Sequence, residues 1–206
     1  GHEVDGQVRK FDSDGDLTQG NKYNSLIFIN FARLLGKDEI KKGTFSLTLG
    51  TAAAIADAQT ADSGSITITD ENAATSYKIN SPAGEYSVLK ATGTSNGGND
   101  VDAARLGAAC GLLFYQAGIA AITPEVFNEY DSGELDSDHK IGFLESADAL
   151  IVDAATDTNM YDSIVDHTQD DVLTGIRHRI LDISFSNTTE LNSTIYFCRV
   201  GHNDFN

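Results

Sequence analysis

The chain has 206 residues and a formal net charge of −17, and 40% of its residues are hydrophobic. This length fits about one domain, and the apolar share is sufficient for a folded core. Strong negative charge without a basic stripe argues against binding to free nucleic acid. No apolar run reaches the ~18 residues of a membrane span, and no signal peptide follows Gly1. We therefore expect a folded chain with neither nucleic acid nor membranes as partners.

The acidic residues are concentrated in one stretch. Between Glu125 and Asp171 there are 14 acidic residues and one basic residue, Lys140, so this stretch carries −13 of the total −17. A solvated acidic surface is the simplest interpretation, and a cation-binding or partner-docking surface is the alternative. A local basic cluster lies further on, and it either pairs with the acidic stretch or is ordinary surface charge: Arg177, His178, Arg179 and Arg199.

The first half of the chain predicts one helix followed by short strands. Residues 1–20 are polar and are expected to form an N-terminal arm. Apolar spacing over Lys22–Leu35 favours a helix that Gly36 can end. Alternating apolar residues then predict strands over Thr44–Leu49, Ser65–Thr69, Tyr77–Ile79 and Tyr86–Leu89. The intervening stretches, rich in small and polar residues, are expected to be loops or turns: Ala52–Gly64, Ser81–Gly84 and Thr92–Asn99.

The second half predicts two β-hairpins with helices between them. In the first hairpin, a turn at Gly118 joins the apolar runs Cys110–Tyr115 and Ile119–Ile122. Thr123 before a proline then predicts a short helix through Phe127. Further helices are expected over Ile141–Ala155 and Asp162–Arg177. The second hairpin joins Arg179–Phe185 to Thr194–Val200 through a turn over Asn187–Ser193.

These elements predict a β-rich α+β fold, with antiparallel sheets in a sandwich-like core and two or three packing helices. Residues 21–206 would form a single β-rich domain, in which the acidic, partly helical segment covers about 125–171. The apolar faces of both hairpins are expected to be buried in one core: Leu112, Phe114, Ile119, Ile183, Phe185, Ile195 and Phe197.

Three aspartates in the arm are candidate calcium ligands. Asp12, Asp14 and Asp16 alternate along a short loop, as carboxylates do in many calcium sites. An EF-hand loop starting at Asp12 would also need glycine at position 17 and glutamate at position 23, where the chain has Leu17 and Tyr23. A polar arm without a metal is the alternative. The acidic run Asp131–Asp138 is a second cation candidate, and no other cofactor is predicted.

The sequence offers no catalytic constellation. The five histidines form no HxH, HExxH or HxxxH pair, and no nucleophile elbow or phosphate-binding loop is present. His167 lies near Asp166 and Asp170, but acidic residues around a histidine are also typical of a solvated surface. Cys110 and Cys198 lie in apolar runs without a CxxC motif, which favours free buried thiols and leaves one disulfide open. We predict that the chain is not an enzyme.

Three passages resemble virion structural proteins of tailed bacteriophages, especially marine and cyanobacterial T-even-like phages. The main one comprises Ile180–Phe185, then Asn187–Arg199, then His202–Asn206, in which a cysteine-containing strand leads to an Asp-Phe-Asn segment. The others are Leu35–Leu47 and Gly111–Ile119. In the family, a Ser/Thr-x-Asn-Pro-Thr stretch typically follows, and here Asn206 is reached before it, which suggests an excerpt.

The resemblance implies a particle component and carries no catalytic residues over. We expect a virion location, with other copies of the chain and other virion proteins as partners. A tail or baseplate position is favoured, and a capsid decoration or neck position is the next choice. A receptor- or glycan-binding fibre domain is the competing class, and clustered exposed aromatic residues would distinguish it.

Overall fold

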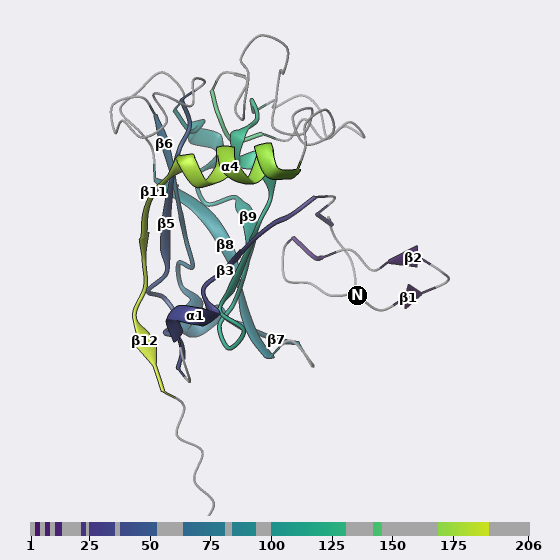
Figure 1. Cartoon of the computed structure of the whole chain (residues 1–206), viewed down its shortest axis with the longest axis vertical. Coiled ribbons are helices and arrows are strands. Elements are labelled where there is room, and N and C mark those ends of the chain that lie inside the picture. Colours follow the sequence, from purple (N-terminus) through teal and green to yellow (C-terminus); the bar gives the residue numbers. More distant parts are fainter. Residues whose placement is uncertain are drawn as a thin grey trace, which may run out of the picture.

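Figure 1 shows a computed structural model of the chain, which describes residues 3–4, 7–8, 11–13, 22–23, 25–35, 38–52, 64–80, 84–93, 100–130, 142–145 and 169–189. Within these ranges antiparallel strands dominate, and helices are few and mostly short. The predicted β-rich α+β class is confirmed. None of the helices in this part of the chain is long and apolar enough to cross a membrane.

One eight-stranded sheet forms the body of the molecule. Seven strands follow one another across it in the order β11, β5, β6, β8, β9, β10, β3, and β7 pairs with β8 beside this path. Each neighbouring pair is antiparallel. The strand bounds are β3 Ile27–Asn30, β5 Ser46–Gly50, β6 Ser65–Thr69, β7 Lys78–Asn80, β8 Gly84–Gly93, β9 Ala109–Phe114, β10 Ile119–Ile122 and β11 Ile180–Ser184.

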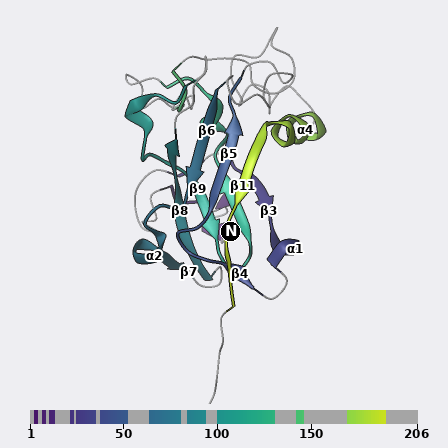
Figure 2. The ribbon, with the colours of Figure 1, turned by 90° about the vertical axis from the view of Figure 1, so that its left-hand side faces the viewer.

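The remaining elements are small. Two further strand pairs are β1 Glu3–Val4 with β2 Gln7–Val8, and β4 Glu39–Ile40 with β12 Asn187–Thr188. The helices are α1 Ala32–Leu35, α2 Ala73–Ser76 and α4 Gln169–Arg179, with 3₁₀ turns η3 Ala103–Arg105 and η4 Pro124–Phe127. Figure 2 shows α4 at one end of the curled sheet and α1, α2 and β4 towards the other.

The main core lies inside the curl of this sheet. Side chains from alternate strand positions are fully buried there, among them Leu47, Ile66, Ile68 and Leu113. Helix α4 adds Val172 and Ile176 to the same cluster. The predicted sandwich-like packing is not confirmed, because the long strands of the described chain belong to a single curled sheet.

The predicted helix over Lys22–Leu35 is wrong for most of its length. Residues Ile27–Asn30 form strand β3, and only the single turn of α1 follows. In β3, half-buried and exposed residues alternate, and Ile27 pairs with Ile122 of β10. Two β-branched isoleucines suit a pleated strand beside a partner better than a helix. Pairing with a strand 90 residues away therefore decides the conformation of this stretch.

The first predicted hairpin is confirmed. β9 and β10 pair with Phe114 opposite Ile119, and Gly118 in the turn has φ +62°, a conformation that favours glycine. The short helix after it is the 3₁₀ turn η4, where the Thr123 hydroxyl accepts a hydrogen bond from the Glu125 amide at 3.3 Å. The predicted strands over 44–49, 65–69, 77–79 and 86–89 correspond to β5, β6, β7 and β8.

The C-terminal predictions are met in part. Of the helix expected over Asp162–Arg177, the part from Gln169 is present in α4, and β11 follows it directly. Residues 162–168 lie outside the described residues. Asn187 and Thr188, expected in a turn, instead form β12, because they extend the edge of β11 alongside β4. The predicted partner strand Thr194–Val200 lies outside the described residues. Of the stretch Ile141–Ala155, the structure describes 142–145, which are not helical. Leu144 forms isolated β-bridges with Val101 and Glu129.

The predicted loops are likewise described only at their ends. Thr92 and Gly93, expected in a loop, complete strand β8, because β8 continues its pairing with β6 as far as Gly93. Residues 94–99, 53–63 and 81–83 lie outside the described ranges, as do most of residues 1–20.

Candidate interaction surface

The outer face of the sheet carries a second apolar cluster. Tyr86, Leu112 and Tyr23 are buried there, and Leu26, Val88 and Phe114 pack against them half-buried. These strand positions alternate with the core positions of β8 and β9, because successive side chains point to opposite faces. The expectation of a single core is therefore wrong for Leu112 and Phe114, which face outward while Ile183 and Phe185 pack on the main core.

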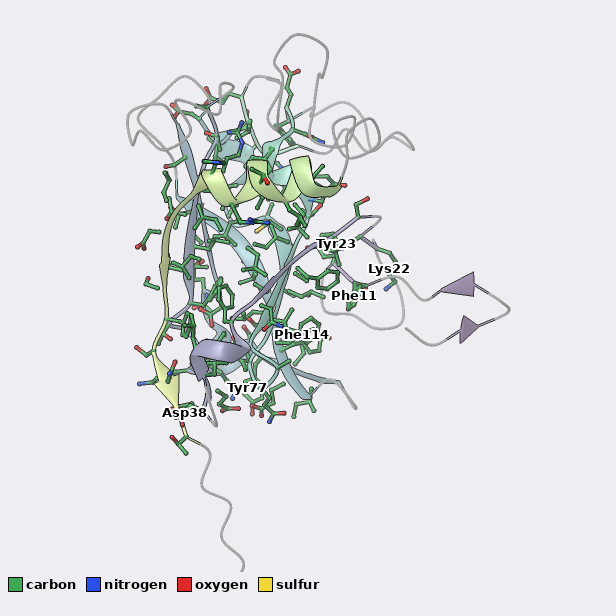
Figure 3. All side chains as sticks on the ribbon, viewed as in Figure 1. Phe11, Lys22, Tyr23, Asp38, Tyr77 and Phe114 are labelled. Atoms are coloured by element: carbon green, nitrogen blue, oxygen red, sulfur yellow. The ribbon has the colours of Figure 1, made fainter. Side chains whose placement is uncertain are left out.

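The N-terminal arm is anchored on this outer cluster. The Tyr23 amide donates to the Phe11 carbonyl at 2.9 Å, and the Lys22 ammonium forms an ion pair with the Asp12 carboxylate. The Phe11 ring lies edge-on to the rings of Phe28 and Phe114, with centroid distances of 5.9 and 6.3 Å. Figure 3 shows Phe11 and Tyr23 between the arm and the outer face of the sheet.

The arm covers the cluster only partly. Phe28 is 54% exposed and Phe11 is 40% exposed, so two adjacent phenyl rings face solvent. From this anchor the chain leads back to the β1–β2 hairpin, which Figure 1 shows at a distance from the sheet. Exposed large apolar side chains gathered at one place are typical of a surface that binds another molecule.

The predicted calcium ligands are only partly described. Asp12 is buried, and its carboxylate pairs with Lys22; Asp14 and Asp16 lie outside the described residues, as does the run Asp131–Asp138. Among the residues that the structure describes, no group of three or more histidine, cysteine, aspartate or glutamate side chains could hold a metal ion. The structure thus assigns Asp12 an ion pair that joins the arm to Lys22, a few residues before β3.

A buried polar network lies at the end of β6. The Asp70 carboxylate accepts hydrogen bonds from the amides of Gly43 and Phe45, at 2.7 and 2.9 Å, and from the Tyr115 hydroxyl at 2.8 Å. The Tyr115 oxygen also lies 2.7 Å from Ser87 Oγ. Burial raises the pKa of the Asp70 carboxyl, and these hydrogen bonds oppose the rise. The network connects the β4–β5 turn to β6, β8 and β9.

Beside η4 lies a cluster with a shifted carboxyl group. Burial raises the pKa of Glu125 to about 7, while the Thr123 hydroxyl and the Arg105 charge oppose that rise. The Arg105 guanidinium packs on the rings of Phe143 and Tyr130, 4.5 and 5.1 Å from their centroids, and burial lowers its pKa. A glutamate with a pKa near 7 gains and loses its proton near neutral pH. Such a shift occurs at catalytic sites, and it also occurs where burial alone disfavours the charge.

We expect the Glu125 carboxyl to make stability depend on pH. Its pKa is higher in the folded chain than the ordinary 4.5, so its contribution is present below pH 4.5 and is lost as the pH rises through about 7. Relative to Glu125→Gln, the free energy of unfolding of the parent should fall by up to about 3 kcal/mol over this range, at 1.36 kcal/mol per pKa unit. Urea unfolding at several pH values measures it.

The matched control is Glu145→Gln, which removes an exposed carboxylate close to the same cluster. It measures how far removal of a nearby exposed acidic side chain changes stability at each pH. A Glu125→Gln difference that varies with pH no more than this control would show that burial does not raise the pKa of the Glu125 carboxyl.

The structure also bears on two earlier predictions, those for the basic cluster and for the cysteines. Arg179, grouped with surface charges above, is fully buried and donates to the carbonyls of Gly50 and Ala52 at 3.2 and 2.5 Å. Its neighbours Arg177 and His178 on α4 are exposed, so the described part of the basic cluster is divided between surface and interior, while Arg199 lies outside the described residues. Cys110 is a free, fully buried thiol, and burial raises its pKa. Cys198 lies outside the described residues.

The comparisons with known proteins give no relative. No family model matches the chain, and neither the curated proteins nor the solved structures contain a match. The function must therefore be argued from the surface itself, and the partly covered outer face with its arm is the feature best suited to binding.

Proposed function

We propose that the chain is a structural component of a bacteriophage particle, associated with the tail or baseplate. In this role it works without catalysis, by binding copies of itself and other virion proteins. The main observation in support of this proposal is the exposed Phe11–Phe28 pair at the base of an arm that extends from the sheet. The sequence resemblance to virion proteins supports the same role.

The geometry of the arm favours contact with another protein. Phe28 stands on the edge strand β3, beside an apolar cluster that already binds Phe11 and Tyr23. A neighbouring subunit that covers the two phenyl rings would extend this cluster and remove apolar surface from water. An arm anchored at one end and projecting at the other is also suited to reach a neighbouring subunit in a symmetric assembly.

Replacing the exposed ring with a charge tests this role. Phe28→Asp is expected to weaken self-association of the purified chain roughly tenfold to a hundredfold, because burial of one phenylalanine contributes about 1.5–3 kcal/mol. Sedimentation velocity over a wide range of protein concentration measures the association. Folding should be unaffected, because more than half of the Phe28 side chain is already exposed.

Leu173→Asp is the matched control, since Leu173 is a 44% exposed apolar residue on α4, away from the arm. It should leave association unchanged. A parent chain that stays monomeric at every concentration, or an equal loss in both variants, would contradict assembly through this surface. In the phage that encodes the chain, purified particles should contain it at a fixed copy number.

A receptor- or glycan-binding fibre domain is the second candidate. The paired exposed rings of Phe11 and Phe28 favour it, because aromatic faces pack against the apolar faces of sugar rings. Two results together would support this alternative over assembly. The parent chain would bind sugars on a glycan array without self-associating, and Phe28→Asp would abolish that binding. A capsid decoration or neck protein would self-associate in the same way as a tail or baseplate protein. Labelled antibody against the chain would distinguish these positions by where it binds on the particle.

A further inference from the structure

Strand β3 forms one end of the sheet order, and it carries the exposed Phe28. It pairs with β10 on one side, and no described strand lies on its other side. Figure 2 shows β3 at the right-hand margin of the curled sheet, above α1. The open side of an edge strand presents backbone amide and carbonyl groups that can pair with a further strand.

The register with β10 shows which backbone groups face this open side. The Phe31 amide donates to the Gly118 carbonyl at 2.7 Å, and these two residues continue the register in which Ile29 lies opposite Ala120. In an antiparallel pair, residues that exchange hydrogen bonds with the partner strand alternate with residues that do not. The amide and carbonyl of Ile29 therefore point to β10, and those of Phe28 point away from it.

The side chains along this edge are apolar on both faces of the sheet. Phe28 lies on the outer face, where its ring meets Phe11 and is 54% exposed. Ile27 and Ile29 pack against the main core but are only half-buried. A strand placed beside β3 would therefore cover apolar surface on both faces, in addition to bonding the backbone of Phe28.

Charge favours a second copy of the chain as the source of that strand. The chain carries a net charge of −17, so two copies repel each other wherever their acidic surfaces meet. Residues 22–35 include no aspartate or glutamate. Strands β7 and β11 also pair with a single described neighbour each, but they contain Lys78 and Asp182. Pairing either of them with its own copy would bring like charges close together.

We propose that β3 pairs with β3 of a second copy, antiparallel about a two-fold axis, and so joins two sheets into one. The inference rests on the proposed function, because it specifies how copies of the chain bind through the Phe11–Phe28 surface. A two-fold contact of this kind uses the same strand of both copies and closes at a dimer. The dimer would then be the unit that binds other virion proteins.

The backbone groups on the open side determine the register of this contact. Since those of Phe28 point away from β10, Phe28 can lie opposite its own copy and exchange both hydrogen bonds with it. Leu26 then lies opposite Asn30 of the other copy, and Ile27 lies opposite Ile29. A two-fold axis perpendicular to the sheet keeps both Phe28 rings on the outer face, where aromatic pairs at opposite positions stabilise neighbouring strands.

Amide exchange distinguishes strand pairing from side-chain packing alone. At a protein concentration at which the chain associates, the Phe28 amide should exchange with solvent deuterium roughly tenfold more slowly, or slower still, than in the dilute monomer. The Ile29 amide is the internal control, because it points to β10 in both states. Quenched hydrogen exchange read by NMR follows both amides in the same sample.

Two cysteine variants test the register without replacing Phe28. Leu26→Cys and Asn30→Cys are each combined with Cys198→Ser, so that the fully buried Cys110 is the other thiol. With oxidised glutathione as the oxidant, an equal mixture of the two variants is expected to form a disulfide between position 26 of one copy and position 30 of the other. Residues opposite each other in this pairing lie about 5.5 Å apart, within the reach of a disulfide.

Each cysteine variant alone is the matched control for the mixture. Two copies of the same variant would place their cysteines four residues apart along the strands, about 13 Å, and a disulfide needs Cα atoms within about 7 Å. The separate variants should therefore form the disulfide dimer roughly tenfold more slowly than the mixture, or not at all.

The outcomes separate this inference from the proposed function. Slower exchange at Phe28, together with a 26–30 disulfide that needs the mixture, supports the proposal. Association that Phe28→Asp weakens, without slower exchange at Phe28, would overturn strand pairing and leave the proposed function standing. Equal disulfide rates in the mixture and in the separate variants would also overturn the pairing. A chain that stays monomeric at every concentration would overturn both.

Discussion

Asp70→Ala is expected to lower the free energy of unfolding by about 3–5 kcal/mol. The substitution leaves the buried Phe45 amide without its acceptor, and a stranded donor costs about 1–3 kcal/mol. It also removes the charged acceptor of the Tyr115 hydroxyl, which keeps only Ser87 Oγ, and a hydrogen bond to a charged group contributes about 1.5–3 kcal/mol. The raised pKa of Asp70 shows that burial already disfavours its charge, so the loss comes from the donors rather than from the missing carboxylate. Urea unfolding near neutral pH measures the effect as a shift in midpoint at constant slope.

Tyr115→Phe is the companion variant for this network. It removes the hydroxyl that bonds to Asp70 and Ser87 but leaves both backbone amides with their acceptor, so we expect a loss of about 1–2 kcal/mol. A larger loss in Tyr115→Phe than in Asp70→Ala would refute the view that the carboxylate is the centre of the network.

Gly111→Ala is expected to cost about 3 kcal/mol. Gly111 lies in β9 opposite Ile122, where an added Cβ would overlap the carbonyl oxygen of Ala121 and lie 3.1 Å from the Ile122 Cα. The neighbours are backbone atoms of β10, so the two strands must separate, and strain of this kind in a packed core costs at least 1–3 kcal/mol. Thermal unfolding and hydrogen exchange of the β10 amides report the effect.

Gly107→Ala separates steric overlap from backbone strain. Gly107 has φ +83° and no atom within 4 Å of an added Cβ, so only the cost of the left-handed conformation applies, about 1 kcal/mol. Losses of similar size in the two variants would contradict the close approach of β9 and β10 at Gly111.

Strands with a turn close by were predictable from local sequence. Ser65–Thr69 and Ile119–Ile122 are found with the predicted bounds, because alternation and the glycine turn act within a few residues. The stretch before Leu35 was not, since its apolar residues fit both a helix and a strand. Its conformation is decided by β10, which no local pattern indicates.

The candidate surface was less predictable than the fold. Phe11 is a lone aromatic residue in a polar arm, and no sequence pattern connects it to the sheet. Its role in anchoring the arm follows only from the contacts of its ring with Phe28 and Phe114. Asp70 and Glu125 look like ordinary acidic residues in sequence, because burial and not spacing shifts their pKa values. The alternating aspartates of the arm, by contrast, indicated a calcium site. The same spacing also occurs in polar loops without a metal, and in the structure Asp12 pairs with Lys22.

The order of the strands also constrains how the chain folds. From β5 to β10 the sheet is a run of neighbours in sequence, whereas β11 joins β5 from more than 130 residues away, with Ile183 opposite Leu47. Loops of that length close late, because their entropy must be lost before the contact forms. On the ribosome, β5 therefore emerges and pairs with β6 long before β11 is synthesised. Until then its other edge and the adjacent Phe45 remain open to wrong partners, which makes this edge the point where a nascent chain is most prone to aggregate.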